Sequence, residues 1–478
     1  MSVKDKAVAI DRFVRTIKAS GVYDDIQAAC IMAGWTNLAG ALYPLKGAAP
    51  TNNGFLAADL DAGIGLKGDG SSKYLNSNRD ASDDPQNDHH ASIYCSSVGG
   101  GALYGAGAGQ VGSTNGGVNV ATGNPNARSR NNAVVVGTQV GYSGTYVASR
   151  SSSTSVDLRW KNETQSFSQS SQATVAKDMW VFARNEATLE AYSDATISWY
   201  SIGSATDLAA LDSAVSTLMA DLRAIDEAGF DRDALAYIRN VEAADGSYLE
   251  TGVKQAINAF VAGCKKDGIW DAIKASCIMC GARTISGALV PLVGPSPTAY
   301  PQPVNFVSAD YDRSSGLKGD GATKYLDSNR AGNADGQDDH HLAVYMSSAD
   351  TGSSVVGVGA AGVAGSTNFG NGSANVFARS RCAAAYTQSP TGFTGFMGIS
   401  REEPSGYDYR YDSSTTPVTQ ASDGLLTDTT FIFARNESGT PNGLSSSRLT
   451  FYSIGSSLDL AALDNRVSTL VAAIGAAI

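Results

Sequence analysis

Apolar side chains recur at helical spacing at the start of the chain and again near its middle. The spacing i, i+3, i+4, i+7 is met by Ile10, Phe13, Val14 and Ile17 and, 247 residues later, by Ile257, Phe260, Val261 and Cys264. This periodicity predicts an amphipathic helix in each place, and the glycines that follow, Gly21 and Gly268, are placed to end them. A second short helix is predicted over Tyr23–Gly34 and over Trp270–Gly281.

Between residues 38 and 203, and again between 289 and 455, apolar residues alternate with polar ones among clusters of Gly, Asn, Asp and Ser. Such alternation predicts many short antiparallel strands, as in a sandwich or jelly roll. The strand candidates are 91–95, 134–136, 146–149, 179–183 and 196–200 in the first stretch, and 342–346, 383–386, 396–400, 431–434 and 449–452 in the second.

A helix is predicted to close each half. Its apolar face consists of Leu208, Leu211, Val215 and Leu218 in the first half and of Leu460, Leu463, Val467 and Leu470 in the second. We expect Ser204 or Ser456 to cap this helix, with Asp207 or Asp459 as the acidic partner three residues on. A further helix over Asp231–Asp245 has no counterpart before the first half.

The two halves are copies of one pattern. GLKGDGSSKYLNSNR (Gly65–Arg79) returns as GLKGDGATKYLDSNR (Gly316–Arg330) with twelve of fifteen positions identical, and FARNE returns at Phe182 and Phe433. YSIGSATDLAALDSAVSTL, which begins at Tyr200, returns from Tyr452 with fifteen of nineteen identical. Blocks repeated in one order at one spacing predict tandem domains of one fold.

Composition excludes several classes of protein. Glycine contributes 52 of 478 residues and only 17% are charged, which favours strands and turns, while 42% hydrophobic residues argue against disorder. The net charge of −11, without a basic cluster, argues against nucleic-acid binding and against anionic membranes. The first residues lack a signal-peptide core, and no apolar run approaches a membrane span, so we expect synthesis and folding in a cytosol without membrane insertion.

All four histidines lie in two pairs, His89–His90 and His340–His341. Adjacent residues of a strand point to opposite faces, so a pair cannot jointly hold one metal ion there. We therefore expect the first histidine of each pair at the edge of the core, and a metal site is the weaker alternative. Cys277 and Cys280 lack a second pair of ligands, so all six cysteines are expected to be free and mostly buried.

Tyr407, Tyr409 and Tyr411 alternate along one predicted strand, and Trp160 lies at the position of Tyr411 in the first copy. Aromatic rings in a row can stack on sugars, so these four residues are the candidate glycan contacts. Packing in the core is the alternative interpretation, since Val156 and Leu158 occupy the other two positions in the first copy.

The remaining candidates favour structural roles. Arginines recur in both copies and are expected to hydrogen-bond loop carbonyls or pair with Asp, with binding of an anionic ligand as the alternative. They are Arg128, Arg130, Arg150 and Arg184, and Arg379, Arg381, Arg401 and Arg435. Asp69 and Asp320 lie in a turn that could contribute to a calcium site, but a lone turn carboxylate is a weak signal because calcium needs about six to eight oxygens. Neither a phosphate-binding lysine, nor a glycosidase carboxylate pair, nor a convincing serine-nucleophile motif is found. We expect no catalytic residues, no metal and no cofactor.

These blocks together resemble a domain of tailed-bacteriophage virion proteins, in which laminin-G or concanavalin A-like jelly rolls occur. They comprise the CIMAG-like segment, the GLKGDGSTKYL-like turn, the DDHH strand, the FARN strand and the final YSIG…LDLAALD helix. The resemblance covers nearly the whole chain and carries no defined active site. It implies a virion component such as a fibre, tail or head-surface protein.

The predicted fold is mainly β, with two tandem concanavalin A-like sandwiches flanked by short helices. We assign an N-terminal helical pair to 1–36, the sandwiches to 37–203 and 284–455, connecting helices to 204–283 and a C-terminal helix to 456–478.

The expected function is that of a non-enzymatic virion surface protein of the fibre or tail adhesin type. We expect the chain to form a homo-oligomer and to have other virion proteins as its partners. It would contact host-surface polysaccharide through the loops in which the copies differ most, 96–111 against 347–363 and 151–176 against 402–427. The alternatives are a capsid-decoration or fibre-to-particle adaptor protein with a purely structural role and, third, a depolymerase acting on surface glycans.

Overall fold

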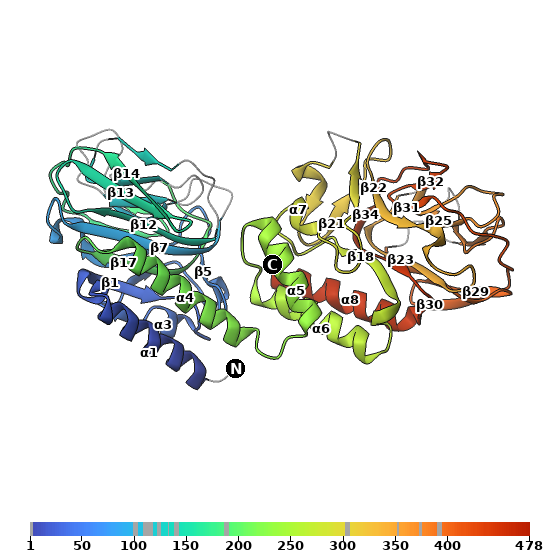
Figure 1. The fold of residues 1–478 in the computed structure, drawn as a ribbon, viewed down its shortest axis with the longest axis horizontal. Coiled ribbons are helices and arrows are strands. Elements are labelled where there is room, and N and C mark those ends of the chain that lie inside the picture. Colours follow the sequence, from blue (N-terminus) through green and yellow to red (C-terminus); the bar gives the residue numbers. More distant parts are fainter. Residues whose placement is uncertain are drawn as a thin grey trace. The chain divides into compact units, whose positions relative to one another are not determined.

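The computed structural model describes residues 3–98, 104–108, 118–121, 126–131, 133–137, 143–185, 191–301, 306–350, 353–371, 375–389 and 394–478. It contains two compact units (Figure 1), the first made of Met1–Gly229 with Gly246–Thr251 and the second of Phe230–Asp245 with Gly252–Ile478. Each unit holds two mainly antiparallel sheets face to face with helices against one of them, which confirms the predicted sandwich class.

In the first unit, the sheet next to the helices runs in the order β14 (Glu163–Ser168), β13 (Ser155–Trp160), β12 (Gly144–Arg150), β7 (His89–Ser97), β17 (Thr196–Gly203), β1 (Ile26–Ile31) and β2 (Pro44–Lys46). In the same sheet β5 (Gly65–Lys67) pairs with β17, and β4 (Leu60–Asp61) pairs with β5. The outer sheet runs β11 (Val135–Val136), β10 (Asn126–Ser129), β9 (Val118–Ala121), β8 (Tyr104–Ala108), β15 (Asp178–Val181), β6 (Tyr74–Asp80) and β3 (Thr51–Asn53), with β16 (Arg184–Asn185) beside β8.

The second unit repeats this plan. Its helix-side sheet runs β20 (Tyr311–Asp312), β21 (Gly316–Lys318), β34 (Arg448–Gly455), β23 (His340–Ser348), β28 (Gly395–Glu403), β29 (Gly406–Tyr411) and β30 (Ser414–Val418), with β18 (Ile273–Ile278) on β34. Its outer sheet runs β19 (Thr298–Tyr300), β22 (Tyr325–Ala331), β31 (Thr429–Ile432), β24 (Ser353–Val358), β25 (Thr367–Asn371), β26 (Val376–Arg379) and β27 (Tyr386–Gln388). In the same sheet β32 (Arg435–Glu437) pairs with β24, and β33 (Thr440–Asn442) pairs with β32.

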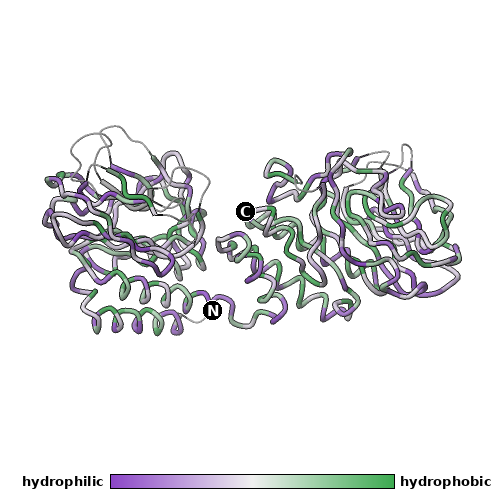
Figure 2. The backbone as a smooth tube through the Cα atoms, turned by 45° about the horizontal axis from the view of Figure 1, so that its top comes forward, coloured by the Kyte–Doolittle hydropathy of each residue, from purple (hydrophilic) through white to green (hydrophobic). Residues whose placement is uncertain are grey.

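The helices are α1 (Val3–Ala19), α2 (Val22–Asp25), α3 (Leu38–Ala41), α4 (Leu208–Asp226), α5 (Arg232–Asp245), α6 (Thr251–Lys266), α7 (Ile285–Ala288) and α8 (Leu460–Ala477). Hydrophobic and hydrophilic positions alternate along the longer ones (Figure 2), as the periodicity predicted. By length and composition alone α8 would suffice to cross a membrane, and 33% of that segment is buried in its own unit.

The helices cover one face of one sheet in each unit. In the first, α1 and α4 pack on that sheet, where the rings of Phe13 and Trp199 lie 5.3 Å apart in an edge-to-face contact. In the second, Phe260 of α6 and Phe451 of β34 repeat this contact at 5.7 Å. Each sandwich therefore has three layers, and the helices leave the outer sheet uncovered.

The predicted second helix is wrong in both copies. Residues Ile26–Ile31 and Ile273–Ile278 are strands paired with β17 and β34. In the first copy Ala28 and Cys30 face the core between the sheets while Ala29 and Ile31 face the helices, so both faces are apolar over residues 28–31. A strand buried on both faces has no alternation, and its run of small apolar residues reads equally well as a helix.

Two smaller predictions are also corrected. The caps of α4 and α8 are Asp207 and Asp459, whose carboxylates accept hydrogen bonds from the first backbone amides of the helix, and not Ser204 or Ser456. The predicted strand 383–386 is displaced, since β27 begins at Tyr386. The helix predicted over Asp231–Asp245 is confirmed as α5, which belongs to the second unit.

Candidate functional site

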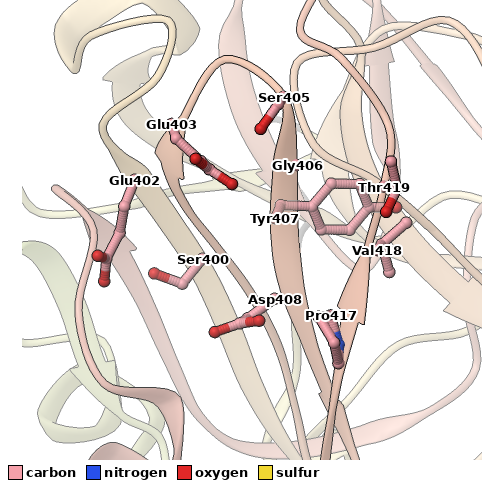
Figure 3. A pocket seen from close by; sticks show the side chains of 10 residues that line it. All are labelled: Ser400, Glu402, Glu403, Ser405, Gly406, Tyr407, Asp408, Pro417, Val418 and Thr419. Atoms are coloured by element: carbon pink, nitrogen blue, oxygen red, sulfur yellow. The ribbon is translucent and has the colours of Figure 1, made fainter.

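A pocket of about 240 Å³ opens on the hairpin of β28 and β29 and on the edge strand β30 (Figure 3). Its lining comes from one short stretch of chain and consists of Ser400, Glu402, Glu403, Ser405, Gly406, Tyr407, Asp408, Pro417, Val418 and Thr419. Most of these side chains carry groups that donate or accept hydrogen bonds, so the pocket suits a polar ligand rich in hydroxyl groups.

Strand register decides which side chains meet in the pocket. Ser400 lies opposite Asp408, and Asp408 lies opposite Pro417, so these residues share one face of the hairpin. Figure 3 shows the side chains of Ser400, Glu402 and Asp408 reaching toward the same side. The ring of Tyr407 points the other way, toward Thr419.

The pocket is acidic. Its carboxylates are Glu402, Glu403 and Asp408, and among the residues that the structure describes no lysine, arginine or histidine lines it. Burial and then the charge of Asp459 raise the pKa of Asp408 above its usual value. Carboxylates accept hydrogen bonds from hydroxyl groups and repel anions, which favours neutral or cationic ligands.

One buried arginine holds the hairpin in shape. The guanidinium of Arg401 donates to the carbonyl oxygens of Glu403, Pro404 and Gly406 at 2.8–3.3 Å, and to those of Ser380 and Gln420, which follow β26 and β30. It also lies 5.2 Å from the centre of the Tyr407 ring. The structural role predicted for this arginine is confirmed, and it fixes the backbone on which the pocket is built.

The pocket lies in a segment in which the two copies differ. Where the second copy has Glu402 and Glu403, the first has Ser151 and Ser152. Nine of the ten lining residues lie within 402–427, which is one of the predicted contact regions, and the tenth is Ser400. Of the other predicted regions, 96–111 and 347–363 lie partly outside the described residues.

The predicted aromatic contacts lie in the core. Trp160 is fully buried and Tyr407, Tyr409 and Tyr411 expose 4%, 1% and 3% of their surface. Each belongs to the apolar cluster between the sheets of its unit. Their faces are not offered to a sugar, so core packing replaces the predicted glycan stripe, and only Tyr407 borders the pocket.

The histidine pairs are buried parts of the sandwich. His90 and His341 each contact a backbone carbonyl and a serine hydroxyl, with distances of 2.6 and 2.7 Å for His341 to Ser456 O and Ser453 Oγ. Burial is the main cause that lowers the pKa of all four imidazoles. Within the described residues, His, Cys, Asp and Glu form no group of three suited to a metal ion.

The turn aspartates are engaged in hydrogen bonds of their own turns, and the cysteines are buried. Asp69 Oδ1 accepts three backbone N–H groups at 2.8–3.0 Å, and Asp320 does the same in the second copy. These carboxylates therefore hold their own turns. All six cysteines are free and buried, as predicted, and burial raises the pKa of the Cys30 thiol to about 11.

Two features escaped prediction. Glu402 and Glu403 were not singled out, although the difference between the copies marked their segment. Pairs of stacked aromatic rings on the outer sheets, built around Tyr74 and Tyr325, were missed as well. The repeated KYL within the best-matched block was the available signal.

No family model and no curated protein matches the chain. Among solved structures, domains LG4–5 of the mouse laminin α1 chain align over 86% of this chain and 92% of theirs, at 10% identity and a TM-score of 0.23. The NanB sialidase of Streptococcus pneumoniae aligns at 13% identity and a TM-score of 0.22 over 28% of this chain, and the match spans about a quarter (24%) of the sialidase. The active domain of bacteriophage CBA120 tailspike protein 2 aligns over 36% of this chain and 29% of its own, at 10% identity and a TM-score of 0.24.

Proposed function

We propose that this chain is a non-enzymatic surface protein of a tailed-phage particle that contacts host-surface glycans through the pocket on β28–β30. The observation that carries the proposal is the pocket itself, because it is rich in hydrogen-bonding groups and lies where one copy of the repeated sandwich departs from the other. A duplicated scaffold with one divergent surface is typical of a binding module. Other virion proteins as partners and a homo-oligomeric state belong to the same proposal.

The experiment compares glycan binding by the full chain and by the double variant Glu402→Ser, Glu403→Ser, which gives the second copy the residues of the first. On an array of host-surface and reference glycans, we expect the variant to bind at least tenfold more weakly. Both glutamates are exposed, so the melting temperature should not change.

Glu163→Ser, which removes an exposed glutamate from the edge strand β14 of the first unit, is the matched control. Equal binding by the double variant would refute the pocket as the contact. Release of reducing ends from a bound polysaccharide would refute the non-enzymatic assignment and favour a depolymerase. An absence of binding to every glycan, with incorporation into particles intact, would favour the decoration or adaptor role.

A further inference from the structure

The outer sheet of each unit carries aromatic rings on the face turned away from the core. In the first unit Leu75 and Val181 of β6 and β15 are fully buried between the sheets. Successive residues of a strand point to opposite faces, so Tyr74 and Trp180 lie on the outward side. Their rings stack with centroids 4.1 Å apart and are half-buried. Tyr192 lies 6.3 Å from Tyr74 and extends this cluster.

The second unit builds the same cluster at the corresponding positions. Leu326 and Ile432 face the core, and Tyr325 and Phe431, one residue before each, turn outward with centroids 4.6 Å apart. Tyr300 of the edge strand β19 stacks on Tyr325 at 5.0 Å and 8° between the ring planes. Tyr300 and Tyr325 are half-buried, whereas Phe431 is only 4% exposed, so the two tyrosines offer the ring surface and Phe431 supports Tyr325. We call these two groups of three rings the aromatic platforms.

A polar pair flanks each platform. In the first unit Asn76 Nδ2 donates to the carboxylate of Asp178 at 2.8 Å. In the second unit the same two positions hold Asp327 and Thr429, and the hydroxyl of Thr429 donates to Asp327 at 2.9 Å. The carboxylate has changed strands between the copies, while one carboxylate and one neutral donor remain beside the rings in both.

The geometry points to a carbohydrate-binding surface on each outer sheet, specific for neutral polysaccharide. The C–H face of a neutral pyranose packs on tyrosine and tryptophan rings, whose polar edges stay in contact with water. The adjacent carboxylate accepts hydrogen bonds from sugar hydroxyls and repels the carboxylates of acidic sugars. The helices cover the other sheet of each unit, so the platforms lie on the face left open to a long polymer.

This inference rests on the proposed function, since it names the class of glycan and adds a second surface for it. Cross-strand packing is the rival explanation of the rings, because such pairs also stabilise a sheet. The test must therefore remove the flat ring faces and keep an apolar contact. Leucine does so at Tyr74 and at Tyr325, one position in each platform.

The experiment measures binding of the full chain to immobilised neutral polymers (glucans, galactans and mannans) and to acidic polymers (polyuronates and polysialic acid). We expect binding to at least one neutral polymer and none to the acidic ones. The double variant Tyr74→Leu, Tyr325→Leu should lose the binding that is independent of the pocket, and each single variant should halve that share of the bound polymer at saturation. Tyr43→Leu is the control, since Tyr43 is 74% exposed outside both platforms.

Preference for acidic polymers, absence of any binding, or unchanged binding by the double variant at an unchanged melting temperature would overturn the inference. If the leucine variants fail to fold, Trp180→Leu alone tests the first platform by the same halving. The pocket variant Glu402→Ser, Glu403→Ser distinguishes the two proposals. Loss of binding there, with the leucine variants unaffected, would retain the proposed function and reject the platforms.

Discussion

Arg401 is the residue on which the walls of the pocket most depend. It is fully buried and donates to five carbonyl oxygens, three of them around the β28–β29 turn. Lysine has one donor centre and cannot reach carbonyls on several strands at once. We predict that Arg401→Lys lowers the free energy of unfolding of the second unit by about 2–3 kcal/mol and abolishes binding that depends on the pocket.

Urea unfolding and the glycan array measure the two effects. Arg150→Lys is the matched control, because Arg150 makes the same kind of contacts in the first unit, to the carbonyls of Ser129, Ser152 and Gln169. It should destabilise the first unit and leave glycan binding at the pocket unchanged. Equal loss of binding in both variants would contradict a specific role of Arg401 in holding the β28–β29 hairpin.

The buried histidines make stability depend on pH. Burial lowers the pKa of His341 from 6.5 to about 4, so between these values the unfolded chain binds a proton that the folded chain does not. The contribution of neutral His341 to the free energy of unfolding is therefore fully present above pH 6.5. It is lost as the pH drops toward 4, which lowers the free energy of unfolding by about 3 kcal/mol for this residue. Urea unfolding from pH 7 to 4 should show the slope, and His341→Asn should reduce it. An unchanged slope in the variant would contradict this origin.

At the scale of single elements, the caps of the closing helices give a direct comparison. Asp459 accepts hydrogen bonds from the amides of Ala461 and Ala462 at 2.8 and 3.1 Å, and Ser456 is not the cap. We predict that Asp459→Ala lowers the free energy of unfolding by about 1 kcal/mol and that Ser456→Ala has a much smaller effect. Denaturant titration of the second unit measures both changes. A larger loss from Ser456→Ala would contradict the capping geometry.

Whether a helix or strand could be predicted depended on whether apolar and polar residues occupy different faces of it. The helix around Phe13 has one apolar face, and the strand around Ile93, although buried on both faces, alternates apolar residues with His, Ser and Tyr. Both were found from their periodicity. The strand around Cys30 is buried on both faces by a sheet and by helices, and these contacts come from distant parts of the chain. Its pattern carried no information about its partners.

The candidate site was predictable as a region and not as residues. The difference between the copies marked the segment that contains Glu402, while alternating tyrosines directed attention to Tyr409, which the sandwich buries. An aromatic stripe has the same sequence whether it faces the core or the solvent. Only the register against β28 and β30 showed which face is which.

At the scale of the whole molecule, the duplication gives each unit an apolar core of its own. Ile197 and Leu449 occupy corresponding positions, are fully buried, and belong to separate clusters, one in each unit. Replacing either by alanine removes buried methyl groups and costs about 2–5 kcal/mol. If the cores are energetically separate, each substitution should affect the unfolding of one unit only.

We therefore predict two thermal transitions that respond separately. Ile197→Ala should lower the melting temperature of one transition by about 5–15 °C and leave the other in place, and Leu449→Ala should do the reverse. Differential scanning calorimetry of the full chain measures both. The double variant should show the sum of the two shifts, because the sites share no neighbours. A single transition that moves with either substitution would mean that the two sandwiches unfold as one cooperative body. A substitution in one unit would then also affect the aromatic platform of the other through global unfolding.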